Sequence, residues 1–222
     1  MTIQWLGHAC FKITENGYSV IIDPYDSNFV DGYPELSAEA DMVLVSHDHP
    51  GHSCTKAVKL SGKSESECPF DIESFEVDHD GVGGIMRNKC KVHILRSGGL
   101  KIAHLADIGT QLNGGEITKL INCDVLMATA GSLTGLPSQE IRRIYDEILA
   151  NVLIPMHYRD ADRGPRRLEQ IKDLEAQFET PEFFKFYDTD TIEIDGSEEP
   201  QVAVLKYLGG SVRSQFPRFK RQ

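Results

Sequence analysis

Short runs of apolar residues, and alternating apolar and polar residues over 70–77, predict a series of β-strands. Two such runs flank Asn16-Gly17, a dipeptide that favours the tight turn of a two-stranded hairpin. A second pair of runs flanks the glycine-containing segment 96–99, which indicates another hairpin. We therefore predict strands over residues 10–15, 18–23, 41–46, 70–77, 91–95, 100–105, 124–128 and 152–156, and a last strand within 200–208.

Two helices are predicted in the second half of the chain. Apolar residues recur at spacings of three and four over 138–150, which produces one apolar stripe. A similar stripe predicts a second helix over 165–178. Early hairpins followed by alternating strands and helices indicate a mixed α/β fold. We expect one domain over residues 1–208 and a loose, basic C-terminal tail over 209–222.

Composition and charge restrict the classes of function. The chain has 222 residues, of which 40% are hydrophobic and 26% are charged, as expected for a globular domain with a sizeable core. A net charge of -11 makes nucleic acid an unfavoured partner, because an acidic surface repels a phosphate backbone. A local basic patch is the alternative, and its candidate residues are Arg142, Arg143, Arg159, Arg163, Arg166 and Arg167.

The cysteines and the apolar segments indicate a reduced, cytoplasmic protein. The five scattered cysteines form neither an even disulfide framework nor a CxxC zinc motif. The first residues lack the basic and apolar segments of a signal peptide. No apolar run reaches the ~18 residues of a membrane span, so we expect no membrane partner. A homo-oligomer is compatible with the sequence.

A dense group of histidines follows the predicted strand 41–46. His47, His49 and His52 lie within six residues. In an extended segment, residues i and i+2 point to the same side, so His47 and His49 can bind one metal ion. Neutral imidazole is the commonest protein ligand for metal ions. The alternative is a solvated polar loop, which the density of the cluster disfavours.

Three further candidate ligands follow predicted strands. These are His79 after 70–77, Asp107 after 100–105 and His157 after 152–156. Functional residues gather at strand ends because a rigid sheet holds the loops there. Taken singly, Asp107 reads more readily as a turn or cap residue. Together with the histidine cluster, the three positions favour a metal site.

The spaced motifs resemble those of a known family. SHDHPGH resembles the HxHxDH signature of the metallo-β-lactamase superfamily. WLGHACF, IIDPYD, VDHD, HLADIG and IPMHY are similar to motifs of its branch that contains ascorbate-6-phosphate lactonase and metal-dependent hydrolases. The resemblance covers roughly residues 2–160 and implies a four-layer αββα sandwich with metal ions at one edge, between the two sheets.

The resemblance also implies a set of ligands. His47, His49 and His79 are expected to hold the first metal ion. His52, Asp107 and His157 are expected to hold the second, with Asp107 shared by both. Zinc is the expected metal, with manganese, iron and nickel as alternatives. His8 and Asp23 are candidate supporting residues around these ligands; the alternatives are a histidine packed beside Trp5 and a turn residue before Pro24.

One position departs from the family pattern. The aspartate of HxHxDH is Gly51 in this chain, and glycine offers no ligand. Asp48 is close in sequence, but alternation places it on the opposite side from His47 and His49. We therefore expect one or two ions, with the second site weakened.

The leading prediction is a metal-dependent hydrolase of a small substrate. A metal-activated water would attack a lactone, ester, amide or phosphodiester bond, with Asp107 and His52 as the catalytic residues. An alternative, motivated by Gly51, is a metal-binding protein that has lost turnover and acts as a sensor or binding protein. A nuclease is a further alternative, which the acidic composition disfavours.

Overall fold

The computed structural model describes residues 1–64, 67–82, 84–86, 88–132, 135–160 and 163–209. Within these residues, most strands belong to a five-stranded and a seven-stranded sheet that pack against each other. Side chains from both sheets, such as Phe11 and Ile94, are fully buried in one shared hydrophobic core. The predicted tail lies outside the described residues apart from Gly209. No helix in the described part of the chain has the length and apolar character needed to cross a membrane.

The five-stranded sheet contains the first predicted hairpin. Asn16 and Gly17 have φ angles of 50° and 76°, the left-handed values that a type I′ turn requires. This confirms the predicted turn and sets the register that buries Ile13 against Val20. The sheet has the order β13 (Thr191–Glu193), β1 (Thr2–Gly7), β2 (Cys10–Glu15), β3 (Tyr18–Ile22) and β5 (Met42–Leu44).

The seven-stranded sheet joins an antiparallel part to a parallel part. The antiparallel part contains the second predicted hairpin, which turns through Gly98 and Gly99. In the parallel part, the two central strands β10 and β11 are buried along their whole length. The order is β12 (Phe184–Phe186), β14 (Gln201–Val204), β11 (Val152–Met156), β10 (Val125–Thr129), β9 (Leu100–His104), β8 (Lys89–Ser97) and β7 (Asp71–Asp78).

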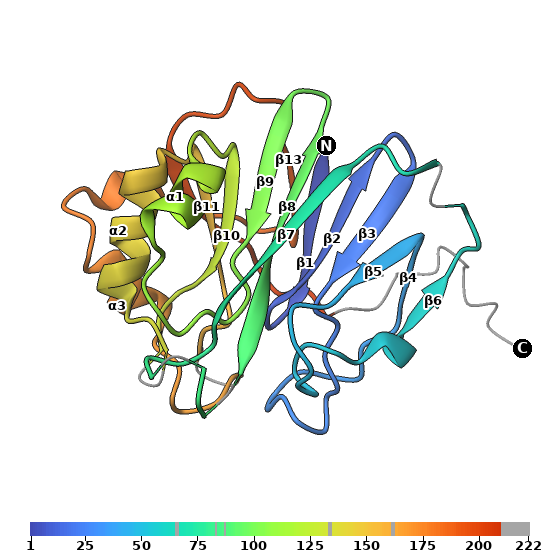
Figure 1. Cartoon of the computed structure of the whole chain (residues 1–222), viewed down its shortest axis with the longest axis horizontal. Helices are drawn as coiled ribbons and strands as arrows, with labels where there is room; N and C mark the ends of the chain where they lie inside the picture. The colour runs from blue at the N-terminus through green and yellow to red at the C-terminus, as the bar shows by residue number, and fades with distance from the viewer. Residues whose placement is uncertain (65–66, 83, 87, 133–134, 161–162, 210–222) are drawn as a thin grey trace, which may run out of the picture.

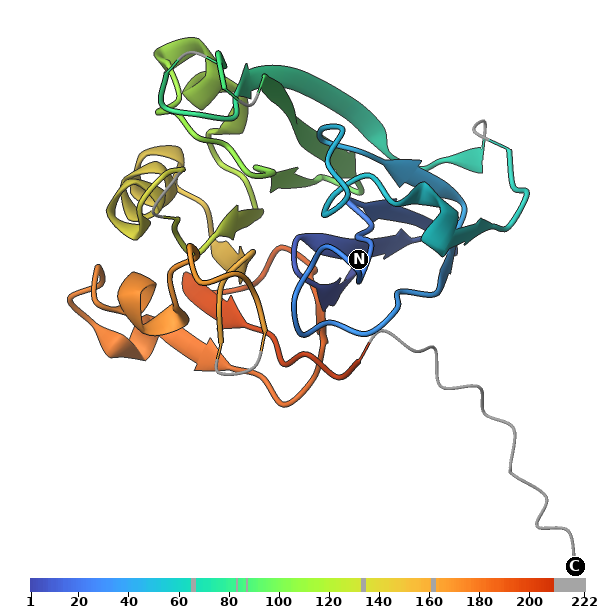
Figure 2. The same cartoon turned by 90° about the horizontal axis from the view of Figure 1, so that it is seen from below.

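In the described part of the chain, three α-helices lie on the outer side of the seven-stranded sheet, away from the other sheet (Figures 1 and 2). They are α1 (Gly114–Leu120), α2 (Ser138–Ile148) and α3 (Ile171–Glu175). The predicted stripe of α2 is buried, including Ile141, Ile144 and Ile148. Asn113 caps α1 by accepting from two backbone N–H groups, and Glu116 completes the capping box.

The predicted helix over 165–178 is wrong at both ends, because α3 spans five residues. Backbone hydrogen bonds hold the segment before it in place: Arg159 N donates to Glu169 O, and Glu169 N donates to Gly131 O. Leu168 is buried there and pairs with Ser132 as an isolated bridge. These long-range contacts, which the local apolar pattern does not reveal, prevent the helix from starting earlier.

The resemblance implies a layer of helices on the outer face of the five-stranded sheet, and the structure shows a different cover there. In the described residues the cover consists of the segment 24–37, the short 3-10 helix η1 (Thr55–Ala57) and the paired strands β4 (Ala38–Ala40) and β6 (Val58–Leu60). Tyr25 and Tyr33 fill a second, smaller apolar cluster beneath this cover. A further 3-10 helix, η3 (Pro181–Phe183), precedes β12. Thus the sandwich has helices on one side and loops and short strands on the other.

The direction of the strands brings the candidate ligands together. β1 and β3 are both antiparallel to β2, and β5 is parallel to β3, so these strands run the same way. β7 and β9 are both antiparallel to β8, and β11 is parallel to β9 through β10. The carboxyl ends of each set therefore lie at one edge of their sheet. The residues that follow these strands are His8, Asp23, His47, His79, Asp107 and His157.

Candidate metal centre

The structure brings the six predicted ligands into one compact group. The ring centroid of His47 lies 4.5 Å from that of His79 and 4.4 Å from that of His52. The rings of His52 and His157 are 5.3 Å apart. In one histidine group, His47, His49 and His52 each offer a nitrogen within 4.8 Å of the others.

Asp107 connects the two halves of this group. Its Oδ2 lies 3.7 Å from His79 Nε2, and its Oδ1 lies 3.6 Å from His157 Nδ1. These separations are too long for hydrogen bonds. Two atoms that each ligate zinc at ~2.0–2.2 Å can lie up to about 4.4 Å apart, so both pairs fit ligands that share an ion. The two oxygens of Asp107 thus face different histidines.

Asp23 and Ser46 set the proton position on His47. Ser46 donates to Asp23 through its backbone N at 2.7 Å and through its hydroxyl at 2.6 Å. Because the Ser46 hydroxyl proton is used there, its oxygen accepts from Nδ1–H of His47 at 2.9 Å. Nε2 of His47 is then unprotonated, and it is buried without a hydrogen-bond partner in the described residues.

Two more ligand candidates are oriented in the same way. His52 Nδ1–H donates to Asp23 Oδ2 at 2.9 Å, and Asp23 is completely buried. His79 Nδ1–H donates to the backbone oxygen of Asp107 in a short hydrogen bond. In both rings Nε2 keeps its lone pair, which is the arrangement that a carboxylate or carbonyl imposes on a metal-binding histidine.

In His49 the unprotonated nitrogen is Nδ1, whereas in His47, His52 and His79 it is Nε2. The backbone N–H of Gly51 donates to His49 Nδ1 at 3.1 Å, so this nitrogen carries the lone pair. Asp48, its neighbour, is exposed and does not belong to the group formed by His47, His49 and His52.

Burial keeps His47 and His157 neutral at physiological pH. Desolvation lowers the pKa of His47 to about 3 and that of His157 to about 4. Burial raises the pKa of Asp107, but the surrounding histidines, His157 and His79 first, outweigh this and lower it to about 2. A carboxylate among neutral imidazoles is the donor set that a divalent cation requires.

The backbone is strained at the residues that leave the sheets. His8, Asp23, Ala106 and His157 all have φ angles between 50° and 55°, in the left-handed region that non-glycine residues rarely adopt. Such residues cluster at functional sites, where the surrounding structure holds them in place. Here His157 N donates to His8 O at 3.0 Å, which ties two of the strained residues together.

The ligand group lines a cavity of about 410 Å³. This volume lies within the range of small-molecule sites. Its wall also contains the apolar residues Phe29, Val30 and Met86 and the cation Arg167. Phe29 and Met86 are 61% and 80% exposed, so they lie at the mouth rather than in the depth of the cavity.

A family model of the β-lactamase superfamily domain matches residues 2–157. The chain belongs to this superfamily. A UPF0173 metal-dependent hydrolase from Caldivirga maquilingensis is 25% identical over 202 residues, which cover 78% of this chain and 88% of that protein. A UPF0173 metal-dependent hydrolase from Hyperthermus butylicus is 21% identical over 192 residues, with 70% and 82% covered.

A solved structure from Thermotoga maritima supports the fold of the superfamily. This metallo-β-lactamase superfamily protein aligns with a TM-score of 0.70 at 24% identity, and the alignment covers 92% of this chain and 97% of that one. The fold class expected from the sequence is thereby confirmed.

The structure also places several further residues around the superfamily site. Tyr158 and Arg159 do not line the cavity; Tyr158 is buried and stacks on Trp5 with centroids 5.4 Å apart. Cys54 is a buried free thiol. Ser46 and Arg167 were not expected at the site. The only sequence feature that could have indicated a role for Ser46 is its position between a strand and His47. No such feature marks Arg167, which reaches the cavity from a loop distant in the sequence.

Proposed function

We propose that this protein is a metal-dependent hydrolase of small substrates. The observation that carries the proposal is the convergence of five imidazoles that line one cavity, with the carboxylate of Asp107 between them. His47, His49, His79 and Asp107 are suited to hold one ion. His52, His157 and Asp107 are suited to hold a second. Imidazole and carboxylate donors fit zinc first, with manganese, iron and nickel as alternatives.

The chain's own residues supply orientation and proton handling. When bound, a divalent metal supplies Lewis acidity that activates water and polarises the scissile bond. Asp107 is ionised at neutral pH, so a lone pair of its carboxylate can accept a hydrogen of the attacking water and align it. His52 is held by Asp23 with Nε2 toward the cavity, which fixes its orientation during the reaction.

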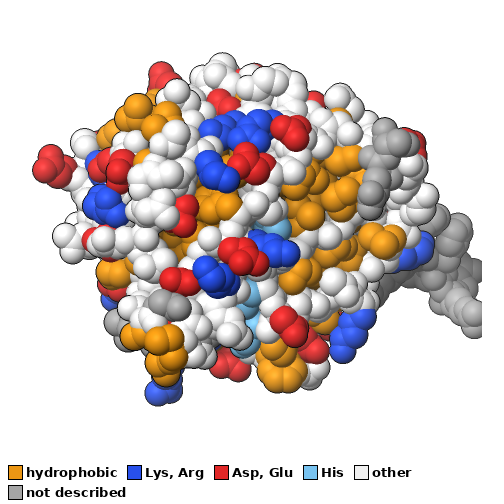
Figure 3. All heavy atoms as spheres, in the orientation of Figure 1, with side chains coloured by type: hydrophobic (Ala, Val, Ile, Leu, Met, Phe, Trp, Pro, Cys, Tyr) orange, Lys and Arg blue, Asp and Glu red, His pale blue; other side chains and the backbone are white. Residues whose placement is uncertain are grey.

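The cavity wall favours a small substrate with an anionic group and an apolar part. Arg167 can pair with a carboxylate or phosphate oxygen, while Phe29 and Met86 offer apolar contact at the mouth. The bond is a lactone, ester, amide or phosphodiester. A nucleic acid is disfavoured, because Arg142 and Arg143 of the candidate basic patch are paired with acidic residues. On the face in Figure 3, basic and acidic side chains are interspersed.

The first test is metal content and hydrolysis. Protein purified without a tag or chelator is expected to contain at least about one zinc or other divalent ion per chain, and to hydrolyse at least one substrate in a panel of anionic lactones, esters, amides and phosphodiesters. His49→Ala should abolish turnover. His93→Ala, which removes another buried histidine away from the cavity, is the matched control.

Failure can take two forms. If the protein neither contains metal nor takes up zinc or manganese, the proposal is wrong. If it binds metal and yet hydrolyses nothing in the panel, the sensor or binding function motivated by Gly51 replaces the hydrolase.

A further inference from the structure

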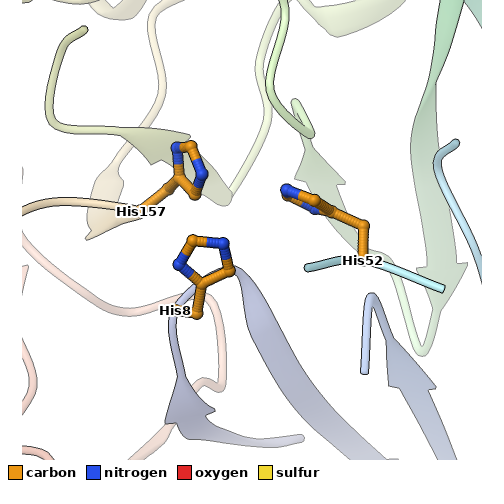
Figure 4. A group of neighbouring side chains, drawn as sticks. All are labelled: His8, His52 and His157. Carbon is orange, nitrogen blue, oxygen red and sulfur yellow. The ribbon is translucent and has the colours of Figure 1, made fainter. Parts of the chain in front are cut away.

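A second group of three histidines lies beside the first. His8, His52 and His157 each offer a ring nitrogen within 4.8 Å of the other two, and all three side chains are buried. The centroids of His8 and His157 are 4.3 Å apart, and those of His8 and His52 are 5.3 Å apart. Figure 4 shows the three rings pointing toward a common gap from three separate parts of the chain.

The main chain fixes His8 in this position. Its backbone oxygen accepts from Trp5 Nε1 and from His157 N, each at 3.0 Å. Gly7, directly before it, has a φ of 105°, and a side chain there would meet the ring of Tyr33 at 2.7 Å. The strained turn after β1 therefore depends on Gly7 and directs the imidazole of His8 into the gap.

The absence of a side chain at position 51 makes room for this imidazole. A Cβ placed on Gly51 would lie 3.3 Å from Nε2 of His8 and 3.1 Å from Nδ1 of His49. Nε2 of His8 thus occupies the space into which a side chain at position 51 would extend. His8 is 3% exposed, and its Nδ1 is buried without a hydrogen-bond partner in the described residues.

We propose that His8 is a direct metal ligand, which together with His52 and His157 binds a divalent ion and takes the place of a ligand at position 51. The inference rests on the proposed metal-dependent function. Three imidazoles are a common ligand set for zinc, and with Asp107 they would supply the four protein donors that zinc usually takes. The site at this end of the cavity is therefore complete without a carboxylate at position 51, and Gly51 does not weaken it.

The test compares His8→Ala, His93→Ala and the double variant His8→Ala/Gly51→Asp with the wild type. Each metal-free protein is titrated with Zn²⁺ against a competing chelator, and with Co²⁺, whose visible absorption reports its ligands. His8→Ala should bind one ion fewer, or bind that ion at least about 10–100-fold more weakly. His93→Ala should match the wild type. The double variant should regain the ion, because the new carboxylate extends into the space left by the imidazole.

The outcomes separate the two proposals. If the wild type binds no metal, the proposed function and this inference both fail. If the wild type binds metal and His8→Ala binds it with unchanged stoichiometry and affinity, the inference alone is overturned. An equal loss of metal in His8→Ala and His93→Ala, without recovery in the double variant, overturns it as well. Should His8→Ala not fold, His8→Phe keeps an aromatic ring without a ligating atom and tests the same point.

Discussion

Gly109 lets two ligand-bearing segments approach each other, and adding one methyl group there tests the geometry of the site. A Cβ on Gly109 would lie 2.4 Å from His79 O and 2.5 Å from both N and Cα of Asp80. Its backbone angle does not fall in the left-handed region, so Gly109→Ala is a test of space alone. Ordinary contacts between such atoms are about 3.5 Å, so the backbone at 79–80 must move by about 1 Å.

The displacement acts on stability and on the metal site together. Overpacking of this kind costs about 1–3 kcal/mol of the free energy of unfolding. The movement also shifts His79, whose Nε2 lies 3.7 Å from Oδ2 of Asp107. Asp107 itself lies two residues before Gly109 in the sequence. A misplacement of about 1 Å can reduce activity about 100-fold. We therefore expect Gly109→Ala to unfold at lower urea concentration, bind zinc more weakly and lose most of its turnover.

Gly114→Ala is the matched control. Gly114 also lacks a left-handed φ, and a Cβ there meets nothing within 4 Å in the described structure. It lies at the start of α1, where alanine should change the free energy of unfolding by less than about 1 kcal/mol in either direction. Unfolding is followed by circular dichroism in EDTA, and zinc affinity by chelator competition. Equal unfolding midpoints and equal zinc affinities for the two variants would refute the close-approach argument.

Three further predictions follow from the same site. Asp23→Asn should weaken zinc binding about 10–100-fold, measured by chelator competition, because an amide N–H would donate to His52 Nδ1 and move the ring proton to Nε2. The metal-free protein should lose stability as the pH falls from about 6.5 toward 4. In this pH range the histidines of the unfolded chain take up protons. Folded His47 and His157 do not, because their pKa values are lowered to about 3 and about 4. Each of these two histidines therefore removes on the order of 1.4 kcal/mol of the free energy of unfolding per pH unit. Urea midpoints in EDTA that stay constant between pH 7 and pH 5 would contradict this. Arg167→Ala should raise KM for an anionic substrate about 5–10-fold with little change in kcat, and the effect should shrink at high salt.

The sequence predicts much of the architecture, because local pattern and tertiary packing agree there. The Asn16-Gly17 turn is left-handed at both positions, as a type I′ hairpin requires, and the apolar stripe of α2 is buried. The helix expected over 165–178 is shorter, because Leu168 lies in a segment that backbone hydrogen bonds hold against Gly131 and Arg159. A periodic apolar stripe indicates which residues are buried. It does not show the backbone hydrogen bonds with distant segments, and these determine whether the residues form a helix.

The candidate site was predictable to the extent that its residues follow strands. His47, His49 and His52 lie within six residues of sequence, and a cluster of this kind is visible without a structure. The proximity of His8 and Gly51 was not predictable, because the two residues lie far apart in the sequence. Only the structure shows that a Cβ on Gly51 would lie 3.3 Å from His8 Nε2.

The strained residues explain how two sheets can form one site. A strand that continued past the sheet edge would keep alternating its side chains between the two faces, and few of them would enter the gap between the sheets. A left-handed residue directly after β1, β3 and β11 breaks this alternation at His8, Asp23 and His157. Each such residue costs on the order of 1–2 kcal/mol. Local hydrogen bonds help to hold them, since Asp23 N donates to Leu44 O and His157 N donates to His8 O. Because hydrogen bonds within the chain itself hold these residues, the backbone fixes the direction of the imidazoles, and metal binding should need little further ordering of the chain.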